Sequence, residues 1–147
     1  MANSSPMSDD APATDAASSA GTVVEFDSAA FARTIPNHTF AIVDFWAPWC
    51  APCRAFAPVF AQSAMKHPEI LHAKVNTEAE QELAGHFNIR SIPMLMVFRE
   101  NVIVFSQAGA LSGAALEQVI KGASELDMDQ VRRELDAADS SAPTDNG

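Results

Sequence analysis

The segment that most constrains the fold runs from residue 40 to residue 54, where an apolar stretch is followed directly by both cysteines of the chain. Residues 40–46 are apolar or aromatic except for Asp44, which is the pattern of a strand covered on both faces. A helix-compatible segment begins right after Cys50. The sequence therefore predicts a strand that leads through a tight turn into a helix, with two thiols at the junction.

Two cysteines separated by two residues at a helix start are placed for redox chemistry. At Cys50 the unpaired backbone N–H groups and the positive end of the helix dipole favour a thiolate, so we expect this residue to be the nucleophile. Cys53 lies one helical turn further on and is expected to attack the mixed disulfide that Cys50 forms with a substrate. Pro52 suits the first turn of a helix, because its missing N–H would have no partner there.

The same cysteine spacing occurs in half of a zinc site and in structural disulfides. A zinc site within one chain needs four ligands, but there is no third cysteine and the four histidines form no matching close pair. A disulfide that closes so short a loop constrains the unfolded chain less than a long-range one. A metal site that bridges two chains, with one such motif from each, stays open.

Residues 43–53 read VDFWAPWCAPC and strongly resemble the thioredoxin active-site signature. Three later segments resemble landmarks of this family in the same order: Lys74-Val75-Asn76, Ser91-Ile92-Pro93 and Gly109-Ala110-Leu111. The resemblance covers about residues 22–123 and departs from the family at Ala51, where most thioredoxins carry glycine. It implies a protein-disulfide oxidoreductase with a redox-active Cys50–Cys53 disulfide that works as a reductase and maintains cell redox homeostasis.

The remaining segments predict alternating strands and helices followed by a hairpin. Strands are expected at residues 23–26, 40–46, 70–75, 94–98 and 102–105, and helices at 29–35, 54–66, 78–87 and from 113 to about 123. Asp27, Thr77 and Ser112 are the expected N-caps. This order predicts an α/β protein with a central mixed β-sheet flanked by helices on both faces, which is the thioredoxin fold that the resemblance also implies.

The organisation that we expect is one thioredoxin domain, residues 22–124, between two extensions. Residues 1–21 are rich in Ala, Ser, Asp and Pro and should form a disordered N-terminal tail. Residues 125–147 are expected to form a short helix capped by Asp127, and then a disordered tail from Ala137. Its apolar residues, at positions 128, 131 and 135, favour a marginal extension packed against the domain; the alternative is a docking helix for a partner.

A formal net charge of −10 argues against a nucleic-acid or anionic-membrane surface. The chain shows neither a secretory signal nor an apolar run of membrane-spanning length. Two cysteines used in catalysis, with none used for structural disulfides, are compatible with a reducing compartment. We therefore expect a cytoplasmic monomer without a bound cofactor. The resemblance implies electron transport from a thioredoxin-reductase-like flavoprotein, which draws on NADPH, to disulfide-containing client proteins.

The resemblance also assigns residues around the two thiols. Its substrate-binding residues would be Trp49, Ala51, Pro52, Ile92, Pro93 and Gly109, and its supporting residues would be Trp46, Pro58 and Lys74. The resemblance implies a cis peptide bond before Pro93, which would leave the backbone of Ile92 free to pair with an extended client. Trp49 would offer a flat apolar surface to that client.

Asp44 is an acidic residue in the middle of an apolar strand, where burial is costly unless the carboxyl is paired, hydrogen-bonded or neutral. It is either a carboxylate satisfied by Lys74 or water, or, as the resemblance implies, a buried acid that takes and returns the proton of Cys53. In the second case desolvation should raise its pKa, with Lys74 acting in the opposite direction.

A binding module is the alternative function from another class. In that case the chain would keep the thioredoxin fold and act as a chaperone or adaptor that holds clients, with redox activity secondary. The histidines are expected at the surface or its boundary, and a Cys-His hydrolase is disfavoured because no residue marks a base.

Overall fold

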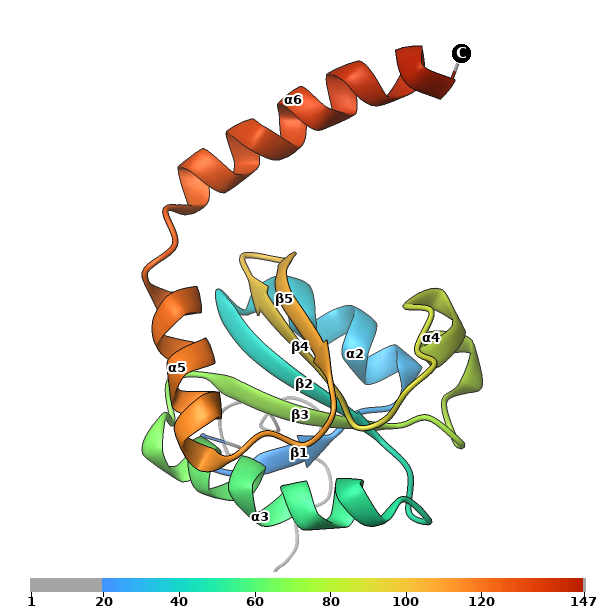
Figure 1. The fold of residues 1–147 in the computed structure, drawn as a ribbon, viewed down its shortest axis with the longest axis vertical. Coiled ribbons are helices and arrows are strands. Elements are labelled where there is room, and N and C mark those ends of the chain that lie inside the picture. Colours follow the sequence, from blue (N-terminus) through green and yellow to red (C-terminus); the bar gives the residue numbers. More distant parts are fainter. Residues whose placement is uncertain (1–19, 147) are drawn as a thin grey trace, which may run out of the picture.

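The structure is a computed structural model in which residues 20–146 are described, so most of the predicted N-terminal tail lies outside the described residues. A five-stranded sheet with the order β1-β3-β2-β4-β5 forms its centre (Figure 1). The strands are β1 (Val23–Glu25), β2 (Phe40–Trp46), β3 (Leu71–Asn76), β4 (Met94–Arg99) and β5 (Val102–Ala108). β1 and β2 run parallel to β3, whereas β4 runs antiparallel to β2 and β5, so the predicted mixed sheet is confirmed.

Helices cover both faces of this sheet. They are α2 (Ser28–Thr34), α3 (Ala51–Lys66), α4 (Gln81–His86), α5 (Gly113–Ser124) and α6 (Met128–Asn146), with a short 3-10 helix, η2 (Ile35–Asn37), after α2. α3 and α5 lie on one face, and α2 and α4 on the other (Figure 1). This is the predicted thioredoxin fold.

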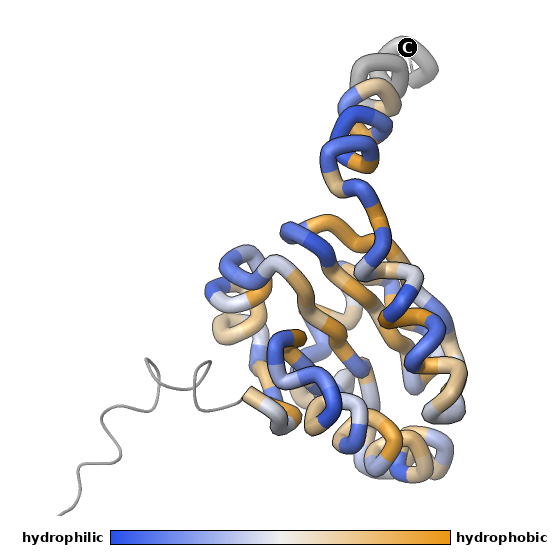
Figure 2. The backbone as a smooth tube through the Cα atoms, turned by 90° about the vertical axis from the view of Figure 1, so that its left-hand side faces the viewer, coloured by the Kyte–Doolittle hydropathy of each residue, from blue (hydrophilic) through white to orange (hydrophobic). Residues whose placement is uncertain are grey.

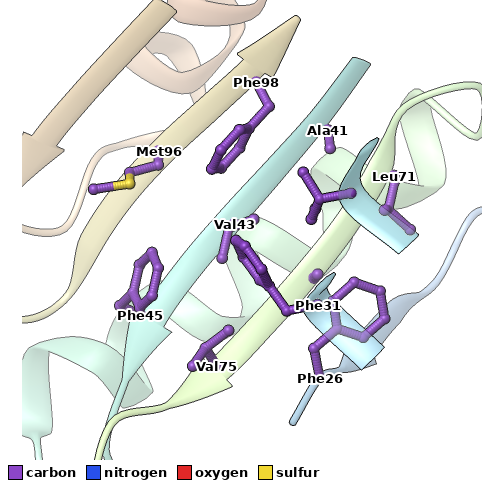
Figure 3. Close-up of a cluster of buried hydrophobic side chains, with 11 residues drawn as sticks. Phe26, Phe31, Ala41, Val43, Phe45, Leu71, Val75, Met96 and Phe98 are labelled. Atoms are coloured by element: carbon purple, nitrogen blue, oxygen red, sulfur yellow. The ribbon is translucent and has the colours of Figure 1, made fainter. Parts of the chain in front are cut away.

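β2 is buried on both faces, as its continuous apolar pattern predicted. Val43 and Phe45 point into the cluster that also holds Phe31 of α2 (Figure 3), whereas Ile42 packs against Phe56 of α3 on the opposite face. Alternating side chains of a strand point to opposite faces. Asp44 therefore lies on the same face as Ile42, the face that α3 covers.

Hydrophobic residues follow this layer arrangement, with apolar stretches along the strands and hydrophilic ones on the outer sides of the helices (Figure 2). In α5 the predicted apolar stripe is buried at Leu116, Ile120 and Ala123. None of the helices in the described part of the chain is long and apolar enough to cross a membrane.

Two of the three predicted caps within residues 22–124 are confirmed. Asp27 Oδ1 accepts from the N–H of Ala30, and Ser112 Oγ accepts from the N–H of Ala115. The predicted Thr77 cap is wrong, because its hydroxyl donates to the Trp46 carbonyl over 3.0 Å.

The helix expected from Glu78 begins only at Gln81. The Asn76 side chain accepts from the backbone N–H of Glu78 over 2.9 Å, so residues 77–79 form a turn instead. Asn side chains stabilise such turns by bonding to a backbone N–H two residues on.

α6 begins after Asp127, whose side chain caps it as predicted by accepting from the N–H groups of Asp129 and Gln130. The helix continues to Asn146, whereas the sequence predicts disorder from Ala137. Low apolar content limits tertiary burial, but it does not prevent an alanine-containing segment from taking helical geometry.

The start of α6 is attached to the domain. Met128 is buried and Arg132 forms an ion pair with Glu100 in the β4–β5 turn, whereas Leu135 is exposed. Further along, α6 extends away from the domain (Figures 1 and 2).

Candidate redox site

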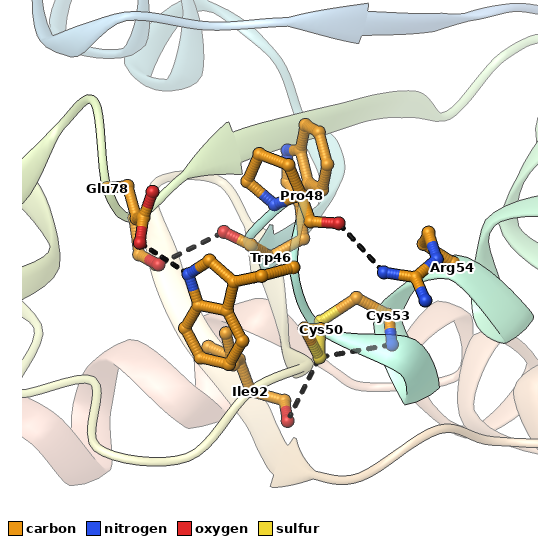
Figure 4. The surroundings of a disulfide bond; sticks show 9 residues. Trp46, Pro48, Cys50, Cys53, Arg54, Glu78 and Ile92 are labelled. Carbon is orange, nitrogen blue, oxygen red and sulfur yellow. Dashed lines mark hydrogen bonds between the residues drawn. A yellow bond between two sulfur atoms is a disulfide. The ribbon is translucent and has the colours of Figure 1, made fainter.

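The two cysteines lie where β2 leads into α3. β2 ends at Trp46, and Cys50 is the N-cap residue of α3 with an extended backbone conformation. Cys50 and Cys53 form a disulfide, and the backbone N–H of Cys53 lies 3.2 Å from Cys50 Sγ, directed at it (Figure 4). Because helix N-termini carry unpaired N–H groups and a positive dipole end, this geometry favours negative charge on Cys50 after reduction.

The first turn of α3 presents its outer side to solvent. Ala51 and Pro52 are exposed, whereas Cys50 and Cys53 are only 4% and 2% exposed. Arg54 Nη1 donates to the Pro48 carbonyl over 2.9 Å and so ties the loop before the cysteines to the helix after them. Pro58 lies further along the same helix at an exposed position, outside the hydrophobic cluster that surrounds the two cysteines.

A segment about forty residues later forms the opposite wall of the site. The Ile92-Pro93 peptide bond is cis, and the Ile92 carbonyl oxygen lies 3.9 Å from Cys50 Sγ (Figure 4). Pro93 is buried and Ile92 is half-buried. The expected cis bond is present, and within the described residues the Ile92 N–H takes part in no backbone hydrogen bond.

Gly109 closes this wall from the end of β5. Its N–H donates to the Pro93 carbonyl over 2.8 Å, and its φ of 103° lies in the left-handed region that favours glycine. A Cβ built at this position would meet nothing within 4 Å. Gly109 therefore makes the turn and also leaves open space beside Pro93.

Trp49 is 63% exposed, next to Cys50. Its indole N–H donates to the carboxylate of Glu78 in the turn after β3. Glu78 was missed by the sequence analysis, because nothing in its local pattern shows that the turn after β3 lies beside the loop before α3.

Asp44 is 1% exposed, and neither of its carboxyl oxygens has a hydrogen-bond partner among the described residues. Desolvation raises the pKa of Asp44 from 3.8 to about 7; Lys74 lowers this pKa and Glu25 raises it further. The predicted direction and the two predicted causes are confirmed. Asp44 is thus not a carboxylate satisfied by a direct bond to Lys74.

Lys74 lies beside Asp44 but turns towards Trp46. Its ammonium is 4.1 Å from the centroid of the Trp46 ring, and the Trp46 indole N–H donates to Glu25 Oε2 over 3.1 Å. The contribution of Glu25 was missed, because only the pairing of β1 with β3 brings it to this place.

His72 is the clearest correction among the histidines, because it is buried rather than at the boundary. Its Nδ1 lies 3.0 Å from the Ile70 carbonyl, its Nε2 lies 3.0 Å from Ser63 Oγ, and desolvation lowers its pKa. This pair is on β3 and α3, away from the disulfide. Among the described residues, no group of three or more His, Cys, Asp and Glu side chains is placed to hold a metal ion.

Comparison with known proteins gives one consistent result. Residues 22–122 match the family model described as Thioredoxin. The chain is 49% identical over 110 residues to "Putative thioredoxin 2" of Streptomyces coelicolor, a match that covers 75% of this chain and 82% of that protein. It is 35% identical over 100 residues to "Thioredoxin" of Porphyra purpurea, with 67% of this chain and 94% of that protein covered.

Solved structures agree on the fold. A single-substitution mutant of thioredoxin from Halobacterium salinarum superposes with a TM-score of 0.68 at 24% identity, over 74% of this chain and 96% of that one. Thioredoxin f from spinach chloroplast, in its long form, gives a TM-score of 0.69 at 23% identity, over 76% and 94% of the two chains.

Proposed function

The chain belongs to the thioredoxin family, and we propose that Cys50, Cys53 and Asp44 carry out the dithiol–disulfide exchange of that family. The protein is a protein-disulfide oxidoreductase that acts as a dithiol–disulfide reductase. The observation that carries the assignment of roles is the Cys50–Cys53 disulfide at the N-terminus of α3, beside the Ile92-Pro93 segment.

In the first step the thiolate of Cys50 attacks one sulfur of a client disulfide. The bond between the two client sulfurs breaks, one client sulfur leaves as a thiolate and takes up a proton, and a mixed disulfide forms. The helix N-terminus and the Cys53 N–H support the negative charge on Cys50 before the attack.

In the second step Cys53 attacks Cys50 Sγ in the mixed disulfide. Asp44 takes the Cys53 proton, the bond between Cys50 and the client breaks, and the second client sulfur leaves as a thiolate. Two electrons have then passed to the client, and the Cys50–Cys53 disulfide is formed. A carboxyl with a pKa of about 7 is suited to both accept and return a proton near neutral pH.

Client binding is assigned to the surface around the disulfide. Trp49 offers an exposed aromatic face, and Ala51 and Pro52 an exposed first turn. The backbone N–H of Ile92, which makes no backbone hydrogen bond within the described residues, suits an extended client segment that adds a strand-like pairing, with Gly109 leaving room beside Pro93.

Electrons are supplied by a separate reductase, for which we propose a thioredoxin-reductase-like flavoprotein that draws on NADPH. A separate reductase as partner is supported by a solved complex of ferredoxin:thioredoxin reductase with thioredoxin f2, whose thioredoxin chain shares this fold. The flavoprotein class and the use of NADPH rest on the resemblance to the family alone. We place this electron transport in the cytoplasm, because the chain uses its two cysteines at the site and has none left for structural disulfides.

Reduction of insulin is the direct test. The native protein should catalyse insulin precipitation with dithiothreitol as electron donor, and Cys50→Ser should not. A chaperone or adaptor would instead bind unfolded clients equally well with and without Cys50 and would show no turnover. The absence of insulin turnover by a folded, reducible native protein would refute the reductase assignment.

A further inference from the structure

Three charged side chains form one row across the face of the sheet that α3 covers. Glu25 of β1 is the register partner of Lys74 of β3, and Lys74 is in turn the partner of Asp44 of β2. Side chains at matched positions of neighbouring strands point to the same face. The stem of Lys74 therefore stands between two carboxyl groups, one exposed and one buried.

The Lys74 ammonium forms no hydrogen bond with the buried carboxyl of Asp44. It lies over the Trp46 ring, 4.1 Å from the centroid, where the negative face of the aromatic system attracts it. That ring is held in turn by the hydrogen bond from its indole N–H to Glu25 Oε2, 3.1 Å long. The carboxylate of Glu25 thus holds the ring, and the ring holds the cation.

The backbone beside Glu25 is well placed for this role. The N–H of Phe26 donates to the Lys74 carbonyl over 2.8 Å, which pairs β1 with β3 directly next to the two side chains. Lys74 lowers the pKa of Asp44 and Glu25 raises it, so the position of the ammonium bears on how readily Asp44 holds a proton.

We propose that Glu25 is a positioning residue for the exchange reaction. By holding the Trp46 indole, it keeps the Lys74 ammonium on the ring and away from Asp44, so that Asp44 can be protonated and deprotonated near neutral pH. The benefit to catalysis rests on the proton transfer proposed above for Asp44 and Cys53.

The test is a titration of the Asp44 carboxyl carbon by NMR in the oxidised protein. In Glu25→Ala the Trp46 ring is no longer held, so the Lys74 ammonium is free to approach Asp44. Asp44 should then titrate at least about one pH unit lower than in the native protein, because an opposite charge within about 4–6 Å lowers a carboxyl pKa by about 1–3. Glu25→Gln, whose amide oxygen still accepts the indole N–H, should lie between the two. In a Lys74→Met background, Glu25→Ala should have a clearly smaller effect.

The matched control is Glu125→Gln, which removes one negative charge from the remote ion pair with Lys121 and should leave the Asp44 titration unchanged. Native-like titration of Asp44 in Glu25→Ala would overturn the proposal. An equal decrease with and without Lys74 would also overturn it, because Glu25 would then act by its charge alone.

The titration needs no turnover, so it separates this proposal from the function that it serves. The rate of insulin reduction by Glu25→Ala is also measured against pH. If the acidic side of this rate profile shifts together with the Asp44 titration, the positioning of Lys74 by Glu25 and the proton transfer by Asp44 are both supported. If the titration moves and the profile does not, the proton transfer by Asp44 fails while the positioning of Lys74 by Glu25 stands.

Discussion

The backbone N–H of Cys53 points at Cys50 Sγ from 3.2 Å, so the residue that resolves the mixed disulfide also stabilises charge on the residue that forms it. The two cysteines are therefore not equivalent, although they share one disulfide. The helix start favours a thiolate at Cys50, whereas Cys53 lies one turn further in, where the buried Asp44 is proposed to handle its proton.

Substitution of the two cysteines should consequently give different products. Cys53→Ser should retain a reactive Cys50 but lose intramolecular release, so mixed disulfides with clients should accumulate. Cys50→Ser should form none. Non-reducing gels of each variant after incubation with oxidised client would show this, and equal trapping by both variants would contradict the assigned roles.

Trp49→Ala should weaken the reduction of protein clients more than that of a small disulfide. The exposed indole presents contact area to a polypeptide, and exposed aromatic anchors often contribute about tenfold or more to protein binding. We expect KM for insulin to rise by about this factor while the rate with an aromatic small-molecule disulfide changes little. A parallel loss with both substrates would mean that Trp49 shapes the disulfide itself.

His72 predicts an acid-sensitive component of stability. Its pKa is lowered by desolvation, so the native protein keeps it neutral while the unfolded chain protonates it near its ordinary pKa of 6.5. The stability from this group is complete above pH 6.5 and is lost as the pH falls below it. Denaturation midpoints at about pH 7.5, 6.5 and 5.5 should fall less in His72→Leu than in the native protein.

Asp44 acts in the opposite direction over the same range, and Glu69, His67 and Glu117 also act on His72, so the comparison is made between variants rather than on one curve. If the denaturation midpoint falls with pH by the same amount in the native protein and in His72→Leu, His72 does not contribute to the pH dependence of stability.

The strands were predictable because each is a short apolar run with its own boundaries, and residues 40–46 form the predicted β2 without change. The start of α4 was not predictable in the same way. Thr77 has the side chain of a cap, but its hydroxyl is taken by the Trp46 carbonyl of a neighbouring strand. A cap is a local signal, and here a tertiary contact outcompetes it.

The residues of the site also fall into two groups, those that the local sequence predicts and those that only the tertiary structure brings together. The cysteines stand in a local motif, and the cis bond before Pro93 was expected only from the resemblance to a family. Glu25 and Glu78 each accept from a tryptophan more than twenty residues away, so only the strand order reveals them. His72 could have been found, since it interrupts an apolar strand just as Asp44 does.

Asp44→Asn should raise stability in a pH-dependent way. Since the pKa rises from 3.8 to about 7, ionising Asp44 in the native protein costs about 4 kcal/mol relative to the unfolded chain. The native protein therefore loses stability as the pH rises from about 4 towards 7 and keeps the full penalty above it. The asparagine side chain is uncharged at every pH and does not bear this penalty.

Denaturation of both proteins at about pH 4 and pH 8 measures the difference. At about pH 4 both side chains are neutral and buried, so the free energies of unfolding should be similar; at about pH 8 the variant should be more stable by about 2–4 kcal/mol. Its insulin reduction should be slower by on the order of tenfold or more, because Cys53 has lost its proton acceptor. A variant that is less stable at the higher pH and equally active would make Asp44 a structural residue only, since neither the ionisation penalty nor the proton transfer would then exist.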